Sequence, residues 1–242
     1  MAIYVISDIH GRFNEFLKLI NYSGLSLDRD DILINLGDMI NRGPDSAKVV
    51  AWFMNMKAVF PNNIICLYGN HEDILLARYN GIVRDDVFYH RKIGGKATED
   101  SYKKEFGGAL IYPKAHLDFI KSLPTYYIKD KYIFFHAGLN LSEGLAGQPF
   151  RNILWDEDKF YTQDTSMFEN TFIFGHTPTE YINKYYGTKG SEIWKCENKI
   201  CIDCTYSKSR KLLLYNLTDD IEHYYSFAQK KCYTKKNGVV IC

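Results

Sequence analysis

The stretch Ile3-Tyr4-Val5-Ile6-Ser7-Asp8-Ile9-His10-Gly11 decides the fold, because an apolar, β-rich run ends abruptly in residues suited to metal chemistry. The same arrangement returns four more times along the chain. The later runs, each with the polar residues that end it, are 32–36 with Asp38, 64–68 with Asn70 and His71, 132–135 with His136, and 171–174 with His176. Nearly continuous apolar runs of this length predict strands that are buried on both faces of a sheet.

Helical patterns lie between these runs. Apolar residues at helical spacing first appear at Phe13, Phe16, Leu17 and Ile20. Gly24 is expected to end this helix and Ser46 to cap a second one, while residues 74–79 and 115–123 are expected to form a third and a fourth. Strands that alternate with helices predict an α/β fold, in which ligands bind at the carboxyl ends of the strands.

The last part of the chain has a different pattern. Residues 199–203, 211–217 and 223–227 are predicted to be consecutive strands with no helix between them. Consecutive strands indicate an antiparallel portion, so we expect a second sheet that packs on the first. We find no repeat and no long linker, and we expect residues 1–242 to form a single domain.

Composition excludes several classes of function. The chain has 242 residues and a net charge of +1, which argues against a nucleic-acid groove or an anionic membrane surface as the main partner. No apolar run approaches the roughly 20 residues that a membrane span needs, and residues 1–8 lack the basic start of a signal peptide. We therefore expect a cytoplasmic protein.

The six cysteines are expected to be reduced thiols. They are Cys66, Cys196, Cys201, Cys204, Cys232 and Cys242. The spacing of Cys201 and Cys204 suits a zinc half-site, but on a strand these two side chains point to opposite faces. We therefore expect no structural zinc site there.

The polar residues at the five strand ends share one chemistry. Carboxylate and amide oxygens combined with imidazole nitrogens suit first-row divalent metals such as manganese, iron, zinc or cobalt. Each of these residues alone is more often a turn, a cap or a buried hydrogen-bonded histidine. Their joint occurrence, drawn from most of the chain, indicates a preformed catalytic metal site rather than a small structural finger.

Five ordered blocks of sequence carry a resemblance to a known family. They are Asp8-Ile9-His10-Gly11, Gly37-Asp38-Met39-Ile40-Asn41-Arg42-Gly43, Gly69-Asn70-His71-Glu72, His136-Ala137-Gly138 and Gly175-His176-Thr177. In this order they resemble the signature of the calcineurin-like metallophosphoesterases, and more narrowly that of the phosphoprotein-phosphatase branch and its bacterial relatives. The expected fold is then a four-layer α/β/β/α sandwich.

The resemblance implies a dinuclear metal centre. Asp8 and His10 would bind the first ion, and Asp38 would bridge both ions. The second ion would be completed by Asn70, His136 and His176. Manganese is the first expectation for both ions, with iron, zinc, cobalt and nickel as the others. Such a pair lowers the pKa of a shared water, which attacks phosphorus directly.

The resemblance also implies how a phosphorylated substrate is handled. Arg42 would hold the phosphate oxygens with its planar guanidinium, and Asn70 and His71 would also contact the substrate. His71 would protonate the leaving group or stabilise the transition state, and Asn41 would orient it.

Two departures from the family pattern stand out. Asn41 replaces an aspartate that would raise the pKa of His71, so we expect weaker acid catalysis or a substrate with a better leaving group. Diadenosine-tetraphosphate hydrolases of this superfamily resemble the chain here. After Trp155, residues 156–159 stand where relatives often place a second phosphate-binding arginine. We expect these residues to form a solvated loop, with Arg151 or Lys159 as weak substitutes for that arginine.

Three functions remain open at this point. The first is a phosphomonoesterase that acts on phosphoproteins or small phosphoesters, and the second is a dinucleoside-polyphosphate hydrolase. The third is a metal-binding module that has lost catalysis and only recognises phosphorylated partners. The segment 84–108 resembles the cap of bacterial relatives, where substrates are selected. Its mixed charge indicates no particular class of substrate. Oligomeric state does not follow from the sequence.

Overall fold

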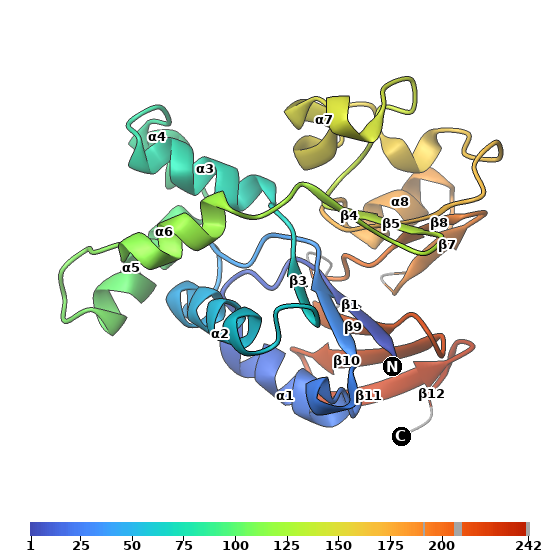
Figure 1. The fold of residues 1–242 in the computed structure, drawn as a ribbon, viewed down its shortest axis with the longest axis horizontal. Coiled ribbons are helices and arrows are strands. Elements are labelled where there is room, and N and C mark those ends of the chain that lie inside the picture. Colours follow the sequence, from blue (N-terminus) through green and yellow to red (C-terminus); the bar gives the residue numbers. More distant parts are fainter. Residues whose placement is uncertain (191, 206–209, 241–242) are drawn as a thin grey trace.

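Two β-sheets form the centre of the molecule in the computed structural model, which describes residues 1–190, 192–205 and 210–240 (Figure 1). The first sheet has the order β12-β11-β10-β9-β1-β2-β3 and the second the order β4-β5-β6-β8-β7. The strands are β1 (Ile3–Ile6), β2 (Ile32–Asn35), β3 (Ile64–Cys66), β4 (Tyr126–Lys129), β5 (Tyr132–Phe135), β6 (Thr171–Phe174), β7 (Trp194–Cys196), β8 (Lys199–Cys201), β9 (Lys211–Asn216), β10 (Ile221–Ser226), β11 (Lys231–Lys236) and β12 (Val239–Val240).

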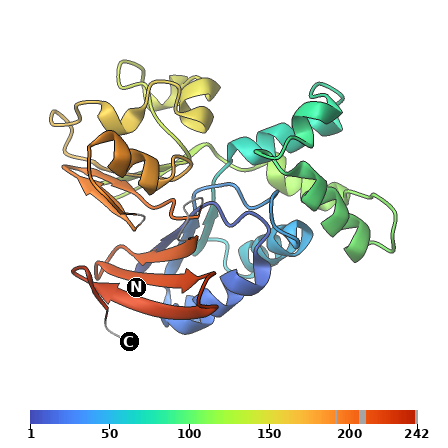
Figure 2. The same ribbon diagram turned by 180° about the vertical axis from the view of Figure 1, so that it is seen from behind.

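Eight α-helices lie in the described residues. They are α1 (Phe13–Ser23), α2 (Ser46–Val59), α3 (Asn70–Tyr79), α4 (Asp85–Phe88), α5 (Gly95–Glu105), α6 (Lys114–Lys121), α7 (Phe150–Trp155) and α8 (Thr179–Tyr185). Helices α1 and α2 pack on the first sheet, and α7 and α8 pack on the second. The views from both sides show α3 to α6 extending away from the sheets on one side of the molecule (Figures 1 and 2). Residues 84–108, which include α4 and α5, form a segment that we call the cap.

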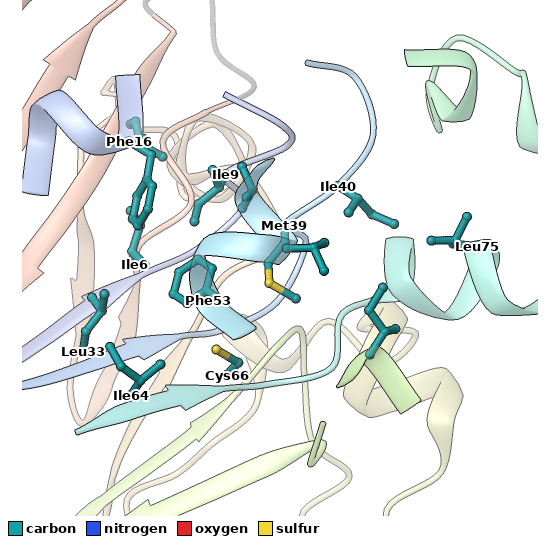
Figure 3. Close-up of a cluster of buried hydrophobic side chains, with 14 of the residues drawn as sticks. Ile6, Ile9, Phe16, Leu33, Met39, Ile40, Phe53, Ile64, Cys66 and Leu75 are labelled. Carbon is teal, nitrogen blue, oxygen red and sulfur yellow. The ribbon is translucent and has the colours of Figure 1, made fainter. Parts of the chain in front are cut away.

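Three apolar clusters hold the layers together. Between the first sheet and helices α1 and α2, Ile6 and Leu33 pack with Phe16 and Phe53 (Figure 3). A second cluster fills the space between the two sheets, where Phe134 is fully buried. The third joins the second sheet to α7 and α8. The fold is therefore the four-layer α/β/β/α sandwich predicted from the sequence.

The predicted strands that carry polar ends are confirmed. β1, β2 and β3 pair in parallel, and so do β5, β6 and β8. Parallel pairing places the carboxyl ends of neighbouring strands at one edge of a sheet, as the site prediction requires.

The prediction for the last part of the chain is wrong in one respect. Strand β8, within predicted residues 199–203, pairs in parallel with β6 in the second sheet. Strands β9 and β10 do form an antiparallel portion, but β9 pairs with β1 and extends the first sheet. The second sheet instead begins with β4 and β5, in the middle of the chain. Local patterning could not show this, because a strand's partner depends on contacts between distant residues.

Two helix starts also differ from expectation. The cap position of α2 is Asp45, and the Ser46 hydroxyl instead accepts a hydrogen bond from the backbone N–H of Asn41 (3.1 Å). Helix α3 begins at Asn70, earlier than predicted, which places Asn70 and His71 on its first turn. Gly24 ends α1 as expected, with φ of 79°.

Five of the cysteines lie within the described residues, and all five are free thiols. Cys201 and Cys204 are buried, and no group of possible metal ligands found among the described residues includes a cysteine. Cys242 lies outside the described residues. No helix that the structure describes has the length and apolar character needed to cross a membrane.

Candidate metal centre

The turns after β1, β2 and β6 carry an unusual backbone. Asp8, His10, Asp38 and His176 all have φ between 48° and 62°, in the left-handed region that ordinary side chains rarely adopt. Such strain persists only where the surrounding structure enforces it, and it is common at functional sites. Close packing enforces it here, since a Cβ on Gly37 would lie 2.8 Å from Gly69 Cα. These turns bring residues distant in sequence into one buried cluster.

Backbone carbonyls orient two of the imidazoles. His10 Nδ1 lies 3.0 Å from the carbonyl oxygen of Ile40, and His136 Nδ1 lies 2.9 Å from that of Leu36. A carbonyl can only accept, so each Nδ1 carries the proton and donates. Each Nε2 therefore presents a lone pair to the site. This arrangement is typical of metal-binding histidines.

Asp38 lies at the centre of the cluster. His10 Nε2 and His71 Nε2 are 3.8 and 3.7 Å from Asp38 Oδ2, and His136 Nε2 is 3.5 Å from Oδ1. These separations are too long for hydrogen bonds. They are close to the roughly 3.0–3.4 Å between two ligand atoms that share one ion at bonds of about 2.1 Å.

Two sets of possible ligands share this carboxylate. One is His10, Asp38 and His71, and the other is Asp38, His136 and His176. Asp8 adjoins the first set, because its Oδ1 lies 3.7 Å from His10 Nε2. Asp38, which is predicted to bridge two ions, belongs to both sets. His71, which was not predicted to be a ligand, also lies close to the first set.

Asn70 completes the second set. Its Oδ1 lies 2.9 Å from His136 Nε2 and 3.1 Å from His176 Nδ1. An amide oxygen cannot donate, and His136 Nε2 carries no proton when Nδ1 donates to Leu36, so this approach brings two acceptors together. Turning the amide over would let its nitrogen donate to both imidazoles. A cation among the three atoms would satisfy them without that change.

Burial sets the protonation of the cluster. It lowers the pKa of His136 to about 4 and that of His176 to about 3. Burial and the neighbouring charge of Asp8 raise the pKa of Asp38. At neutral pH the imidazoles are therefore neutral and offer lone pairs, while the buried carboxylates need compensating positive charge. The donor set and its electrostatics both fit divalent cations.

Glu72 joins the turns around Asp38. Its carboxylate accepts hydrogen bonds from the backbone N–H groups of Asp38 (2.8 Å), Met39 (2.9 Å) and Gly69 (3.1 Å). Burial raises its pKa to about 7. Glu72 belongs to the block Gly69-Asn70-His71-Glu72, but no role for it is predicted from the sequence. Its role is to fix the turn after β2 against the turn that starts α3.

Asn41 contacts His71 as expected. The amide Nδ2 of Asn41 lies 2.9 Å from His71 Nδ1. Thr98 of the cap fixes the amide, because its hydroxyl donates to Asn41 Oδ1 (2.6 Å) and accepts from the Asn41 backbone N–H (2.9 Å). With Nδ2 as the donor, His71 Nδ1 accepts, and the proton of the neutral imidazole resides on Nε2. Arg42 Nη2 therefore cannot donate to that atom, although the two nitrogens are 3.1 Å apart. Thr98 was not foreseen, because its contact depends on how the cap folds back.

Arg42 reaches over the cluster from the same turn. Its Nη1 lies 2.6 Å from His10 Nε2, and its Nη2 lies 3.1 Å from His71 Nε2. The cap loop holds this arginine, since Arg42 Nε donates to the Lys92 carbonyl (3.0 Å) and Arg42 N donates to the Gly94 carbonyl (3.1 Å). Gly94 is required here: its φ is 71°, and a Cβ would lie 2.9 Å from Arg42 N.

The expectation of a solvated loop at residues 156–159 is wrong for Asp156. Its side chain is buried, accepts hydrogen bonds from Phe160 N (2.5 Å) and from the Thr177 hydroxyl (3.2 Å), and has its pKa raised to about 6 by burial. Glu157 and Asp158 are exposed as predicted. Arg151 is 80% exposed and faces Glu157 at 3.7 Å, so it points to solvent.

Asp203 is a site neighbour that the sequence analysis missed. It follows β8 as Asp8 follows β1, and its side chain is buried. Burial and the nearby charge of Asp8 raise the pKa of Asp203 to about 8, although Thr205 donates two hydrogen bonds to Oδ1. The sequence signal for Asp203 is a sixth apolar run that ends in a polar residue. The predicted strand over residues 199–203 includes Asp203, whereas β8 ends at Cys201.

The four-layer fold and the two ligand sets that share one carboxylate are those of a metallophosphoesterase. The sequence profile of the calcineurin-like phosphoesterases matches residues 1–203, and the chain belongs to that family. The match confirms the family resemblance seen in the five sequence blocks.

Individual relatives give a narrower comparison. A symmetrical bis(5'-nucleosyl)-tetraphosphatase from Chromobacterium violaceum is 29% identical over 191 residues, covering 77% of this chain and 60% of the relative. The chain spans between 22% and 60% of the lengths of the curated relatives it matches.

Solved structures support the fold alone, because their sequence identity is low. A protein designated only provisionally a diadenosine tetraphosphatase has a TM-score of 0.61 at 16% identity, covering 96% of this chain and 92% of that one. A serine/threonine phosphatase from Saccharomyces cerevisiae has a TM-score of 0.57 at 16% identity, covering 98% and 80%.

The raised pKa of Asp203 predicts a pH-dependent stability in the metal-free protein. In the folded state Asp203 keeps its proton up to about pH 8, whereas in the unfolded state it ionises near pH 4. Its contribution to stability is therefore full below pH 4 and is lost as pH rises towards 8. Asp203→Asn removes this loss, so the variant should gain about 2 to 4 kcal/mol relative to wild type between pH 5 and pH 8.

Urea unfolding at several pH values with a chelator present measures this difference. Asp28→Asn, a change at an exposed aspartate, serves as the matched control. Parallel stability curves for wild type and Asp203→Asn would show that Asp203 does not titrate in this range.

Proposed function

We propose that the protein hydrolyses phosphoanhydride bonds in dinucleoside polyphosphates, with diadenosine tetraphosphate as the representative substrate, using two divalent metal ions. The observation that carries this proposal is the neutral amide of Asn41 against His71 Nδ1 at 2.9 Å. The name of the Chromobacterium violaceum relative supports it. The sequence alone favours phosphomonoester hydrolysis, whereas the Asn41 contact and the name of this relative support anhydride hydrolysis as our first proposal.

The residues present fit the two ions. Asp8, His10 and Asp38 would hold one, and Asp38, Asn70, His136 and His176 would hold the other, with manganese as the first candidate. Bound there, the ions supply a water of lowered pKa and neutralise the phosphoryl oxygens. Arg42 Nη1 shares the His10 lone pair that would bind the first ion. With that lone pair engaged by metal, the guanidinium is released to hold phosphate oxygens.

His71 would then act on the leaving group. Because Asn41 Nδ2 donates to its Nδ1, the neutral imidazole carries a proton on Nε2, the atom that faces Arg42 and Asp38. A neutral imidazole is a weaker acid than the imidazolium that an aspartate partner would favour. A departing nucleoside diphosphate carries its own charge well and needs less protonation than an alkoxide. A substrate with a good leaving group therefore suits the weak acid that His71 is when it contacts Asn41.

Hydrolysis of three substrates in parallel tests this function. Manganese-loaded protein should cleave diadenosine tetraphosphate with a kcat/KM at least about tenfold above that for p-nitrophenyl phosphate or a phosphopeptide, a difference of roughly 1.4 kcal/mol in transition-state binding. A preference for the phosphopeptide would establish the phosphomonoesterase instead. Bound manganese without turnover of any substrate would indicate a recognition module.

Asn41→Asp tests the account of His71. A carboxylate raises the pKa of the imidazole, so the variant should gain most with poor leaving groups. We expect the ratio of kcat for phenyl phosphate to kcat for p-nitrophenyl phosphate to rise about tenfold. Asn55→Asp, on the exposed face of α2, is the matched control and should not alter the ratio. An unchanged ratio in Asn41→Asp would refute this role of Asn41.

A further inference from the structure

A basic cleft of about 800 Å³ opens beside the metal centre. His10 and Arg42 line its inner end, so it is continuous with the proposed site. The sandwich contributes one wall of the cleft, with Arg12, Thr205 and Arg210. The cap contributes the other wall, with Arg91, Gly94, Lys96, Ala97 and Asp100. The cleft therefore runs from the metal ligands out between the cap and the sandwich.

The charges of this cleft are unbalanced. It is lined by five cationic side chains and one carboxylate, Asp100, which already pairs with Lys96. Across the part of the chain that the structure describes, Arg12, Arg91 and Arg210 have no carboxylate within 4.0 Å. The whole chain carries a net charge of only +1, so this concentration of positive charge is local. A concave cationic surface of this kind attracts anions and holds them.

Arg12 is held in place rather than free in solvent. Its guanidinium lies 4.5 Å from the centre of the Phe227 ring, and the residue is half-buried. Burial lowers the pKa of Arg12, the negative charge of Glu15 opposes this shift, and the positive charge of Arg210 adds to it. Holding an arginine against an aromatic ring reduces the rotamer entropy that a ligand contact would otherwise cost.

We propose that this cleft binds the non-scissile phosphates of a polyphosphate chain whose scissile phosphate lies at the metal centre. The inference rests on the proposed function and adds the residues that select its substrate, Arg12 and Arg91 from opposite walls. A phosphomonoester has no second phosphate for these arginines to bind. The cleft thus distinguishes linked phosphates from single ones.

Inhibition of p-nitrophenyl phosphate hydrolysis tests the cleft without requiring that diadenosine tetraphosphate be a substrate. Inorganic tripolyphosphate and orthophosphate are compared as inhibitors of the manganese-loaded protein. In wild type, tripolyphosphate should inhibit at a concentration at least about tenfold lower. The double variant Arg12→Met, Arg91→Ala should weaken inhibition by tripolyphosphate about tenfold and that by orthophosphate less than about twofold. Methionine keeps the packing of the Arg12 side chain on Phe227.

Two controls make the result decisive. Tripolyphosphate also chelates manganese, so all proteins are compared at one free manganese concentration, where chelation is the same. Arg84→Ala removes another exposed cap arginine, which pairs with Asp86 and does not line the cleft, and should leave both inhibition constants at wild-type values. Circular dichroism and thermal unfolding confirm that the double variant is folded.

The outcomes separate the cleft from the proposed function. Equal weakening of inhibition by both compounds in the double variant would contradict the binding of linked phosphates in the cleft. The absence of a preference for tripolyphosphate in wild type would contradict it as well. If the cleft result holds but diadenosine tetraphosphate is not cleaved, the polyphosphate subsite stands and the nucleotide substrate is wrong. For wild type that cleaves diadenosine tetraphosphate, the double variant should raise KM for it about tenfold, which distinguishes a nucleotide-linked chain from free polyphosphate.

Discussion

The buried carboxylate of Asp38 is the constraint on which the rest of the site depends. It faces the Nε2 atoms of three histidines and has almost no access to solvent. The negative charge of Asp8 lies close enough to raise the pKa of Asp38. A buried carboxylate without a positive partner is costly, and neutral imidazoles do not offset that cost. Divalent cations would, and their ligands are already in place. The need to neutralise this charge links the fold to its chemistry.

The surrounding structure keeps this arrangement in place. Glu72 holds the backbone of Asp38 and Met39, and carbonyls of Leu36 and Ile40 hold two imidazoles. These contacts come from the turns themselves, so the turns set the orientation of these side chains. The left-handed backbone at Asp8, His10, Asp38 and His176 is the strain that accompanies such positioning.

The cap contacts residues of the buried cluster and also lines the basic cleft. Thr98 sets the orientation of Asn41, the Lys92 and Gly94 carbonyls hold Arg42, and Arg91 lines the basic cleft. The cap therefore contacts Asn41, which adjoins the proposed acid His71, and Arg42, which is proposed to hold phosphate. It also lines the cleft proposed to bind the other phosphates of the substrate. A change in the cap can alter specificity while the metal ligands remain unaltered.

The sequence predicted which residues gather in the buried cluster better than it predicted their surroundings, for a physical reason. Asp8, Asp38 and His136 follow local apolar runs, and parallel strands bring such ends together automatically. Asp203 follows the same rule and was missed only because its strand ends earlier than its apolar pattern. The contacts of Thr98, the burial of Asp156 and the pairing of β9 with β1 depend on packing between distant segments, which local patterning does not encode.

Anomalous diffraction from crystals of the manganese-loaded protein tests whether Asp38 bridges two ions. We predict two peaks at the manganese absorption edge, about 3.5–4 Å apart, with the Asp38 carboxylate bonded to both. His136 Nε2 and His176 Nδ1 should be bonded to one ion, and His10 Nε2 to the other. A single peak, or two ions that do not share Asp38, would contradict a dinuclear centre built on this carboxylate.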